Sequence, residues 1–527
     1  MPKVLISDKL APEAVEIFKE RGLEVDFKPG LSAEELLEII GDYDGLAIRS
    51  ATKVTAEVLA AAKNLRAIGR AGIGVDNVDV PAATKAGVIV MNTPFGNSVT
   101  TAEHAISLML SLTRQIPQAH ASTVAGKWEK SKFLGTELSG KKLGVIGCGN
   151  IGAIVADRAQ GLKMRVLGFD PFLTPERAKS LGIEKVELDE LLAKADFITL
   201  HTPLTDTTRN IISADALQKT KKGVRIINCA RGGLIDELAL CAALHSGHVA
   251  GAALDVFAEE PARENILFEA PNLIATPHLG ASTVEAQEKV ALQVAEQLSD
   301  YLMNGAVTNA LNMASVTAEE APVLQPYMTL GKLLGSFLGQ VDTPDITKIC
   351  LEFDGKAASL NEAPVLASTL AGLLGPKMDS VNMVNAASIA SSNGIDVSTI
   401  RHDRRCDYES LLRVTISFEG GTRTVAGTLI GGNKPRLVEV QNIAVEAEFP
   451  ENMLYLRNYD KPGFIGALGS VFGDVGLNIA TFHLGRKEAG GEAVALVEVD
   501  GAIDDTALSA IRALELVVRA DRMSFAQ

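Results

Sequence analysis

Three polar side chains in the middle of the chain have the chemistry of proton transfer and anion binding: Arg231, Glu260 and His278. Histidine titrates nearest to neutral pH, so His278 is suited to take a proton from a hydroxyl group. A carboxylate bonded to the other ring nitrogen, here Glu260, fixes the tautomer and raises the pKa of the imidazole. An arginine fork such as Arg231 holds a carboxylate through two hydrogen bonds. Oxidation of a 2-hydroxy acid needs this set of groups.

All three residues follow the ends of predicted strands, where open α/β sheets bind their ligands. Taken singly, each also has a plain structural interpretation: a loop histidine, a solvated acid in a turn, and a surface charge beside two glycines. Their common position at one edge of a sheet favours the chemical interpretation.

A glycine-rich turn is the first of the elements that must position these groups. The predicted strand 143–146 runs into Gly147, Gly149 and Gly152, which have the Gly-x-Gly-x-x-Gly spacing of a dinucleotide-binding turn. The turn opens a helix whose first N–H groups suit a phosphate. Asp170 ends the next strand, near the spacing of about 20 residues at which a carboxylate meets the adenosine ribose. Because a carboxylate there repels a 2′-phosphate, the sequence predicts NAD rather than NADP.

Short apolar strands alternate with helical segments on both sides of this turn, which predicts two parallel α/β units. The first unit has no glycine fingerprint, so we expect it to bind the substrate. A long helix from Ser98 leads into the second unit. A helix that starts at Ser282-Thr283-Val284-Glu285, which has the form of a capping box, returns the chain to the first unit. The predicted strands are 4–7, 46–50, 65–69 and 88–91, then 143–146, 165–169, 197–200, 224–228, 251–255 and 273–275.

The C-terminal part of the chain shows two further patterns. Segments 349–353 and 412–418 predict a mixed α/β unit without a cluster of chemical side chains, which we interpret as a spacer or assembly module. Helices then fit after the first and third of four further strands, in the β-α-β-β-α-β order of a ferredoxin-like unit. These strands are predicted at 453–457, 478–484, 493–499 and 517–523.

Length and composition limit the classes of protein to which this chain can belong. A chain of 527 residues divides into several domains, and its net charge of −15 opposes general affinity for nucleic acid or an anionic membrane. No apolar segment is long enough to cross a bilayer as a helix. Five scattered cysteines predict reduced thiols, and eight histidines without ligand spacing predict no metal. No secretory leader is recognisable, so we expect a cytoplasmic protein.

Three strings surround the chemical residues: Gly69-Arg70-Ala71-Gly72-Ile73-Gly74-Val75-Asp76-Asn77-Val78-Asp79, Asn92-Thr93-Pro94-Phe95-Gly96-Asn97-Ser98 and Pro277-His278-Leu279-Gly280-Ala281-Ser282-Thr283. With Arg231, Glu260 and the glycine-rich turn, they resemble the D-isomer-specific 2-hydroxyacid dehydrogenases. The resemblance spans essentially the whole chain, including the long C-terminal extension of the members that oxidise 3-phospho-D-glycerate. It implies NAD-dependent oxidation of that compound to 3-phosphohydroxypyruvate, the first step of the phosphorylated route to L-serine.

The resemblance also implies roles for residues at matching positions. The cofactor-binding set is Gly147, Gly149, Asn150, Ile151, Gly152, Asp170, Thr202, Cys229, Ala230, Arg231, Asp255, His278, Gly280 and Ala281. The substrate-binding set is Arg49, Ser50, Gly74, Val75, Asn97, Arg231 and His278. For Arg49 the chemistry gives an independent reason, because a phosphorylated substrate needs a cation in the first unit; the alternative is an arginine that caps a strand end. Ile73 departs from members with a hydroxyl residue there.

Three lysines, Lys127, Lys130 and Lys132, surround Trp128. They fit a solvated face better than an anion site at a subunit contact.

The C-terminal unit resembles an ACT regulatory domain through the segments 458–466 and 476–480. Asp460 and Asn478 match positions that bind L-serine across an ACT dimer, and Asn458 stands where the family usually has histidine or tyrosine. Pro462 suits a first helical turn that Asp460 can cap. The alternative is an ACT fold kept for assembly alone.

We therefore expect an α/β protein with two doubly wound Rossmann-like domains, a mixed α/β intervening domain and a C-terminal ferredoxin-like ACT domain. The expected boundaries are 1–97 with 283–312 for the substrate domain, 98–282 for the NAD domain, 313–448 for the intervening domain and 452–527 for the ACT domain. We expect a homo-oligomer, with a tetramer favoured. The alternatives are a glyoxylate, hydroxypyruvate or D-lactate dehydrogenase, which usually lacks the long extension, and a NAD-sensing binding protein like the corepressors that share this fold.

Overall fold

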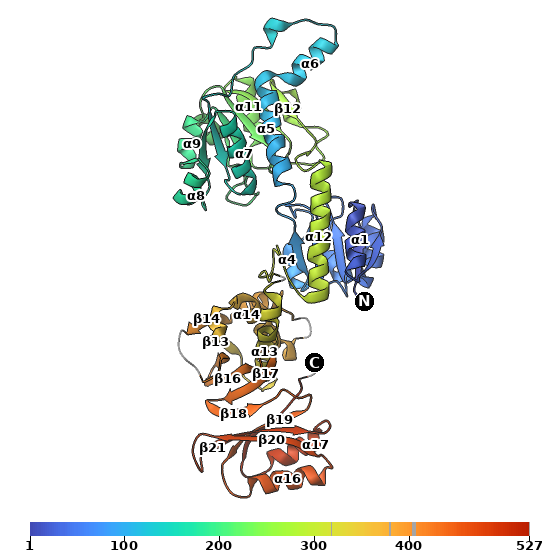
Figure 1. The fold of residues 1–527 in the computed structure, drawn as a ribbon, viewed down its shortest axis with the longest axis vertical. Helices are drawn as coiled ribbons and strands as arrows, with labels where there is room; N and C mark the ends of the chain where they lie inside the picture. The colour runs from blue at the N-terminus through green and yellow to red at the C-terminus, as the bar shows by residue number, and fades with distance from the viewer. Residues whose placement is uncertain (318, 379–380, 403–406, 526–527) are drawn as a thin grey trace.

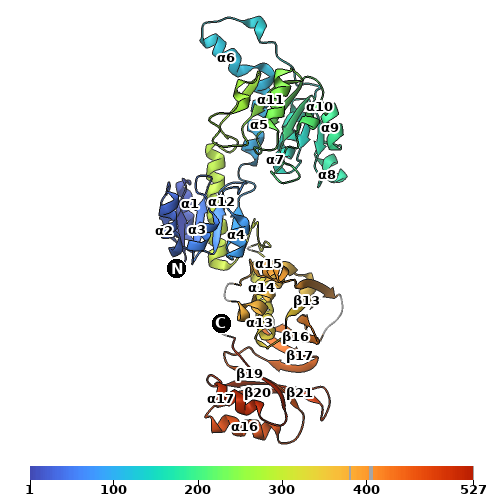
Figure 2. The same ribbon diagram turned by 180° about the vertical axis from the view of Figure 1, so that it is seen from behind.

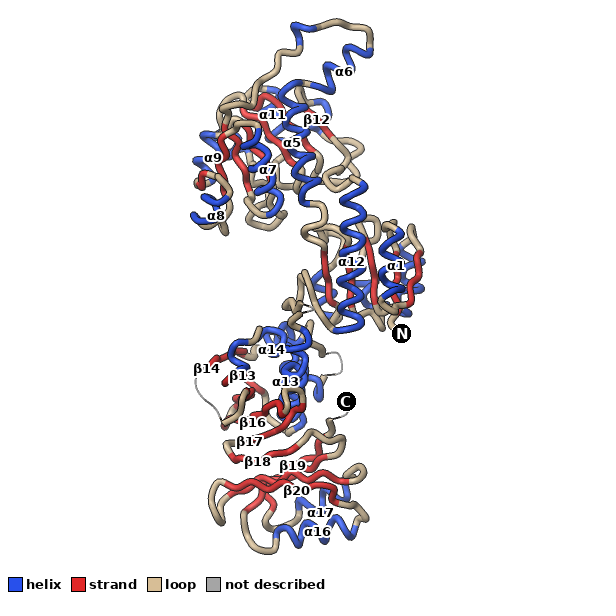
Figure 3. Tube along the Cα trace, in the orientation of Figure 1, coloured by secondary structure: helices blue, strands red, loops and turns tan. Residues whose placement is uncertain are grey.

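The computed structural model is elongated, and the residues that it describes form four β-sheets (Figure 1). It describes residues 1–317, 319–378, 381–402 and 407–525. We call each sheet with its helices a unit and number the units in chain order. The second unit lies at one end of the molecule, followed by the first, the third and the fourth (Figures 1 and 3). No helix within the described residues is long and apolar enough to cross a membrane.

The first sheet is parallel, with the strand order β2-β1-β3-β4-β5. Four of its strands confirm the predicted ones to within two residues at each end. β2 was not predicted, because this edge strand, Glu-Val-Asp-Phe, is half polar. The strands are β1 (Lys3–Ile6), β2 (Glu24–Phe27), β3 (Gly45–Ile48), β4 (Ala67–Arg70) and β5 (Ile89–Asn92), and the helices are α1 (Pro12–Glu20), α2 (Ala33–Ile39), α3 (Ala56–Ala61) and α4 (Val80–Lys85).

The second sheet is also parallel, in the order β12-β11-β10-β9-β6-β7-β8. The strand order reverses beside β6, and the glycine-rich turn follows this strand, at the topological switch point where such sheets bind ligands. The strands are β6 (Lys142–Ile146), β7 (Arg165–Phe169), β8 (Glu184–Lys185), β9 (Phe197–Leu200), β10 (Val224–Asn228), β11 (Val249–Leu254) and β12 (Leu273–Ala275). The helices are α5 (Ser98–Arg114), α6 (Ile116–Val124), α7 (Asn150–Gly161), α8 (Pro175–Ser180), α9 (Leu188–Lys194), α10 (Ala214–Lys219) and α11 (Glu237–His245).

The chain passes twice between the first and second units, and the two passages are neighbours. α5 enters the second unit, and α12 (Val284–Asn304) returns to pack on the first sheet, as predicted (Figure 1). The hydroxyl oxygens of Thr100 and Thr283 are 3.4 Å apart, and the Thr101 hydroxyl donates to the carbonyl of Gly280 at 2.9 Å. The predicted capping box was wrong: Thr283 caps the helix, and the residue three positions later is Ala286, which has no carboxylate.

The third sheet is mixed, in the order β14-β13-β15-β16-β17-β18, and confirms the predicted mixed α/β unit. Its two long helices pack closely, because Gly335 and Gly339 let one backbone touch the other. The strands are β13 (Ile346–Gly355), β14 (Asp396–His402), β15 (Ser410–Phe418), β16 (Gly421–Ile430), β17 (Lys434–Val440) and β18 (Ile443–Ala447), and the helices are α13 (Ala321–Gln340), α14 (Glu362–Leu374) and α15 (Ala386–Ser392).

The fourth sheet is antiparallel, in the order β20-β21-β19-β22, and has the predicted ferredoxin-like sequence of elements. Its helices cover one face and lie away from the third unit (Figures 1 and 2). The predicted cap by Asp460 was wrong: the helix begins after Gly463, whose φ of +98° is left-handed, so Pro462 lies outside it. The elements are β19 (Met453–Tyr459), α16 (Phe464–Asp474), β20 (Ile479–Arg486), β21 (Glu492–Val499), α17 (Asp505–Arg512) and β22 (Val517–Met523).

The other face of the fourth sheet is buried on the third unit. One hydrophobic core contains Phe337 and Leu334 from α13 together with Tyr455 and Leu496 from the fourth sheet. The rings of Phe337 and Tyr455 pack edge to face with centroids 5.3 Å apart, and Phe525 stacks on Phe337 at 6.4 Å. The third and fourth units therefore share one core.

Candidate active site

The predicted histidine and glutamate are bonded to each other. His278 Nδ1 and Glu260 Oε2 are 2.6 Å apart, and the second Glu260 oxygen accepts a hydrogen bond from the Phe257 N–H at 3.1 Å. The hydrogen bond to Glu260 raises the pKa of His278 above its ordinary value. Burial alone would raise the pKa of Glu260, but the donors His278 and Phe257 hold it below its usual range. The pair can therefore accept a proton at Nε2 and stabilise the imidazolium that forms.

A buried aspartate shapes the loop that carries His278. Asp255 is fully buried, and its carboxylate accepts hydrogen bonds from the Thr276 hydroxyl and from the N–H groups of Leu279 and Gly280, at 2.6 to 2.8 Å. His278 has a left-handed φ of +56°, which costs about 1–2 kcal/mol for a non-glycine residue. The bonds to Asp255 offset this cost and fix the direction of the imidazole. The predicted contact of Asp255 with the cofactor stays a prediction.

Arg231 lies against the first unit. Its Nε donates to Asp76 Oδ2 at 3.0 Å, and its Nη1 donates to the carbonyl of Ala230 at 2.7 Å. The backbone of Gly74 passes so close to the guanidinium that a Cβ at this position would lie 1.8 Å from Nη2. A larger residue at position 74 would therefore displace the end of the Arg231 side chain.

A cleft of about 750 Å³ opens between the first two units beside these groups. Arg49 reaches it from the end of β3, in a loop that Asp8 fixes by accepting from the Arg49 N–H at 2.6 Å. Asn97 is buried, and its side-chain oxygen has no hydrogen-bond partner among the described residues. Predicted residues from both units line this cleft: Arg49, Ser50 and Asn97 from the first side and Glu260, His278 and Ala281 from the second.

Arg70 also lines the cleft and was not among the predicted site residues. Its Nε is buried and has no hydrogen bond to any described residue, and its Nη1 donates to the carbonyl of Ala71 at 3.2 Å. Burial, followed by the charges of Arg231 and Arg49, lowers its pKa to about 10. A cation in this state is suited to bind an anion that enters the cleft. The sequence did contain a signal for Arg70, namely its position at the end of a parallel strand. Arg231 was predicted from a similar position, shortly after the end of β10.

The glycine-rich turn has the geometry that a dinucleotide needs. A Cβ at Gly152 would lie 2.0 Å from the Gly147 carbonyl oxygen, so glycine is required for the helix to pack on its strand. Space around Gly149 is open, and this residue caps α7 without a side chain, which leaves the first N–H groups of the helix available. Asp170 accepts a hydrogen bond from the Cys148 N–H at 2.9 Å, which holds its carboxylate beside the turn. These features fit NAD.

The other predicted cofactor residues border this turn or the neighbouring strand ends. Asn150 and Ile151 form the first turn of α7, and Thr202 follows β9. Cys229 is buried after β10, and burial raises the pKa of its thiol. Cys148, Cys229, Cys241 and Cys350 form no disulfide, and Cys406 lies outside the described residues.

Two of the predicted effector residues, Asn458 and Asp460, lie at the carboxyl end of β19, whereas Asn478 precedes β20 at the opposite end of the fourth unit's sheet. Asn458 is buried in β19 with its side-chain oxygen unpartnered among the described residues. Asp460 accepts from Arg486 Nη1 at 2.6 Å and from the Gly490 N–H at 3.2 Å, and Arg486 lowers the pKa of its carboxyl. Asn478 donates to Asp500 at 2.7 Å.

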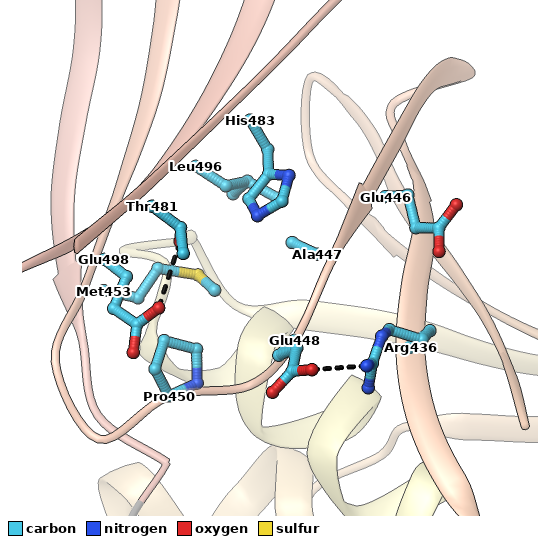
Figure 4. A pocket seen from close by; sticks show the side chains of 10 residues that line it. All are labelled: Arg436, Glu446, Ala447, Glu448, Pro450, Met453, Thr481, His483, Leu496 and Glu498. Atoms are coloured by element: carbon cyan, nitrogen blue, oxygen red, sulfur yellow. Dashed lines mark hydrogen bonds and ion pairs between the residues drawn. The ribbon is translucent and has the colours of Figure 1, made fainter. Parts of the chain in front are cut away.

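A second hollow, of about 560 Å³, lies where the third and fourth units meet (Figure 4). Arg436 pairs with Glu448 there, and Thr481 bonds to Glu498. None of the predicted site residues lines it. In the described part of the chain, no three His, Cys, Asp or Glu side chains are placed to hold a metal ion. The acid–base pair and the unpaired guanidinium groups instead meet in the cleft between the first two units.

Comparison with known proteins agrees with this geometry. Residues 106–280 match the model for the NAD-binding domain of D-isomer specific 2-hydroxyacid dehydrogenases. Residues 323–441 match the D-3-phosphoglycerate dehydrogenase intervening domain, and residues 452–516 match the ACT domain. Fold and site thus define a NAD-binding oxidoreductase of the 2-hydroxyacid dehydrogenase class.

Relatives that match nearly the whole chain narrow this class. A D-3-phosphoglycerate dehydrogenase from Synechocystis is 42% identical over 97% of this chain and 92% of its own length. One from Bacillus subtilis is 41% identical over 96% of both chains, and one from Methanocaldococcus jannaschii is 42% identical over 97% of this chain and 98% of its own length. The chain belongs to the D-3-phosphoglycerate dehydrogenases of the D-isomer-specific 2-hydroxyacid dehydrogenase family.

Solved structures match 59% of the chain. A glyoxylate reductase from Paecilomyes thermophila is 34% identical and superposes with a TM-score of 0.55, covering 59% of this chain and 98% of its own. The apo D-lactate dehydrogenase from Escherichia coli is 29% identical with a TM-score of 0.53, covering 59% of this chain and all of its own. These proteins share the catalytic fold, whereas the relatives above also match the third and fourth units.

Proposed function

We propose that this protein oxidises 3-phospho-D-glycerate to 3-phosphohydroxypyruvate with NAD, the first step of phosphorylated L-serine biosynthesis. The observation that carries the proposal is the cleft between the first two units, where the bonded pair of His278 and Glu260 faces a cluster of guanidinium groups. A dianionic substrate needs several cations, and its hydroxyl group needs a base. The relatives that match nearly the whole chain are named D-3-phosphoglycerate dehydrogenases, which is the name of an enzyme with this activity.

In this proposal His278 is the base that accepts the proton of the substrate hydroxyl group. The imidazole takes the hydroxyl proton at Nε2 while the substrate carbon loses its hydride, and Glu260 stabilises the imidazolium through Nδ1. Bound NAD supplies the acceptor of the hydride. Because Asp255 fixes the loop around His278, the base is held in place before the substrate arrives.

In this proposal the carboxylate and the phosphate of the substrate bind to different arginines. Arg231, with the backbone of Gly74 and Val75, binds the carboxylate and polarises the neighbouring carbon–oxygen bond. Arg49 and Ser50 bind the phosphate, with Arg70 as an additional cation in the same cleft. Asn97 offers its unpartnered oxygen to a substrate hydroxyl group.

NAD lies along the carboxyl edge of the second sheet in this proposal. The uncapped first turn of α7 binds the pyrophosphate through Gly149, Asn150 and Ile151, and Asp170 binds the ribose hydroxyl groups. The remaining predicted residues line the same path: Gly147, Gly152, Thr202, Cys229, Ala230, Asp255, Gly280 and Ala281.

A substrate panel tests this function. The enzyme is incubated with NAD and 3-phospho-D-glycerate, D-lactate or glycolate, and also with NADH and hydroxypyruvate or glyoxylate, while absorbance at the NADH band is followed. We expect 3-phospho-D-glycerate to give the highest kcat/KM. A preference for an unphosphorylated acid would support one of the alternative dehydrogenases. Tight NAD binding without turnover of any substrate would support the corepressor-like alternative.

We propose further that the chain divides into four domains, with the boundaries 1–97 plus 283–312, 98–282, 313–448 and 452–527, of which the last two are joined by their shared core. L-Serine is the proposed effector of the fourth domain, through Asn458, Asp460 and Asn478. The buried, unpartnered oxygen of Asn458 supports this assignment because a bound amino acid can satisfy it. Added L-serine is expected to lower the rate of NADH formation, and an unchanged rate would favour an assembly role.

We also propose a homo-oligomer, with a tetramer favoured. The segment from α6 to residue 136 projects from the second unit (Figure 2) and exposes Val124, Trp128 and Leu134 by 73, 87 and 82%. Apolar groups gathered on a projecting arm are typical of a subunit contact. Light scattering with size-exclusion chromatography measures the mass, and a monomer would contradict the proposal. Unpaired thiols fit a reducing compartment, and we place the protein in the cytoplasm.

A further inference from the structure

We propose that Asp76 is a positioning residue that orients the Arg231 guanidinium from the opposite unit, so that its remaining donors face the substrate carboxylate. The inference rests on the proposed function, because it concerns how Arg231 binds that carboxylate. It adds the side chain of Asp76 to the carboxylate-binding group formed by Arg231 and the backbone of Gly74 and Val75.

The hydrogen bonds of Arg231 show which edge of the guanidinium is used. A guanidinium has five N–H donors. One of them, on Nε, points to Asp76 Oδ2 at 3.0 Å, and one on Nη1 points to the carbonyl of Ala230 at 2.7 Å. The remaining donors lie on Nη1 and Nη2, at the end of the side chain. Asp76 therefore occupies the side of the guanidinium and leaves its end available for a ligand.

The backbone around Arg231 is fixed independently of Asp76. Asn228 is buried, donates to the carbonyl of Arg231 at 2.9 Å and accepts from the Ala230 N–H at 3.0 Å. The freedom that remains is the rotation of the long side chain, and Asp76 is the described acid that bonds to it. Without this bond the side chain would sample several rotamers, and ordering it would reduce substrate affinity.

The loop that carries Asp76 also carries the predicted carboxylate contacts. Gly74 lies two residues before Asp76, and its backbone touches Nη2 of Arg231. The available end of the guanidinium is thus beside the backbone of Gly74 and Val75. A substrate carboxylate bound there would accept hydrogen bonds from the guanidinium and from the backbone N–H groups. Asp76 therefore holds the Arg231 guanidinium of the second unit beside the backbone of Gly74 and Val75 in the first unit.

The charges of the cleft give Asp76 a second effect. The side chains of Arg49 and Arg70 have no carboxylate partner among the described residues, and the charge of Arg231 disfavours the protonated form of Arg70. Asp76 opposes this repulsion. Its side chain is 76% exposed, so the ion pair contributes little to folding stability, and its effect is expected on substrate binding.

A competing interpretation makes the opposite prediction. Asp76 could act as a placeholder that occupies Arg231 until the substrate displaces it. Removing a placeholder lowers the KM for the substrate, whereas removing a positioning residue raises it. The sign of the change in KM therefore decides between the two.

The test compares Asp76→Ala and Asp76→Asn with the wild-type enzyme, using 3-phospho-D-glycerate and NAD. We expect the KM for 3-phospho-D-glycerate to rise about tenfold in Asp76→Ala, because the substrate must then order the Arg231 side chain. Asp76→Asn keeps an oxygen acceptor and should lose less. The dissociation constant of NADH and the Tm should stay unchanged. Glu38→Ala, which removes an exposed acid from α2 of the same unit, is the control and should behave as wild type.

A double-mutant cycle shows whether Asp76 acts through Arg231. In an Arg231→Lys background the guanidinium is gone, so Asp76→Ala should raise the KM much less than in the wild type. Equal effects in both backgrounds, an unchanged KM or a lowered KM in Asp76→Ala would overturn the inference. A wild-type enzyme that does not oxidise 3-phospho-D-glycerate would instead overturn the proposed function.

Discussion

The junction between the first and second units and the junction between the third and fourth are built in opposite ways. The first is a cleft in which polar groups meet, such as Arg231 with Asp76 across 3.0 Å. The second is a continuous apolar core in which the rings of Tyr455 and Phe525 both pack on Phe337. Solvent and substrate can enter the cleft, whereas the shared core excludes both.

This difference means that the two pairs of units are held together with different strength. Exposed ion pairs contribute little to stability, so they do not hold the first two units rigidly together. Burial of aromatic side chains contributes several kcal/mol and does hold two units together. We therefore expect the third and fourth units to move as one body, and the first two to move relative to each other.

Loss of the base in the cleft should have the largest effect. His278→Asn keeps a residue type that tolerates the left-handed backbone but removes the proton acceptor. We expect kcat to fall by about 10²–10⁴-fold, the usual contribution of general base catalysis. Stopped assays of NADH formation measure kcat, and titration with NADH checks that the cofactor still binds. A kcat near that of wild type would remove His278 from the mechanism.

Removal of an aromatic ring from the shared core tests the other side of the comparison. Phe337→Ala should reduce the free energy of unfolding by about 3–5 kcal/mol. Because Phe337 packs on Tyr455, hydrogen exchange should speed up in β15 and in β19 together. Phe18→Ala, in the separate core of the first unit, is the matched control and should leave both strands protected. Faster exchange confined to the third unit would show that the two units do not share one core.

Loss of a cation from the cleft should affect one substrate more than another. Arg49→Ala is expected to raise the KM for 3-phospho-D-glycerate about 10–100-fold, because a charge-assisted bond to phosphate is lost. The KM for D-glycerate, which has no phosphate, should change much less. Lys63→Ala, an exposed cation of the same unit, serves as the control. Equal changes for the two substrates would contradict the phosphate role.

The smallest expected effect is a shift in pH dependence. Glu260 raises the pKa of His278, so Glu260→Gln should lower it. Oxidation needs the neutral imidazole, and activity is lost as the pH falls through the pKa of His278. The acid limb of the kcat/KM profile should therefore move to lower pH in Glu260→Gln, alongside a reduced maximum. A limb that stays in place would mean that another group controls it.

Sequence patterns predicted the parts of the site that depend on local structure. The turn from Gly147 to Gly152 was recognisable because each glycine answers a local steric need, and Arg231, Glu260 and His278 were recognisable because each follows a strand. The pairing of His278 with Glu260 was proposed from chemistry and is present at 2.6 Å.

The parts that were missed depend on contacts between distant segments. Asp76 has no local signal, since its partner Arg231 is supplied by another unit. The strand-end position of Arg70 was visible in the sequence, but the burial of its Nε without a hydrogen-bond partner among the described residues is a property of the folded cleft. Asp460 looked like a helix cap from its spacing, but Arg486 and Gly490 bind its carboxylate instead. Local propensity cannot weigh such tertiary competitors.

The neighbouring passages at Thr100 and Thr283 have a consequence for how the catalytic cleft opens. Two covalent connections side by side act as paired pivots, and they reduce the relative motion of the first two units to a swing about one short axis. Groups near that axis, such as Asn97 and Gly280, hardly change their separation during the swing. Groups on the outer rim travel along an arc whose length grows with their distance from the pivots, so a small rotation suffices to admit or enclose a substrate.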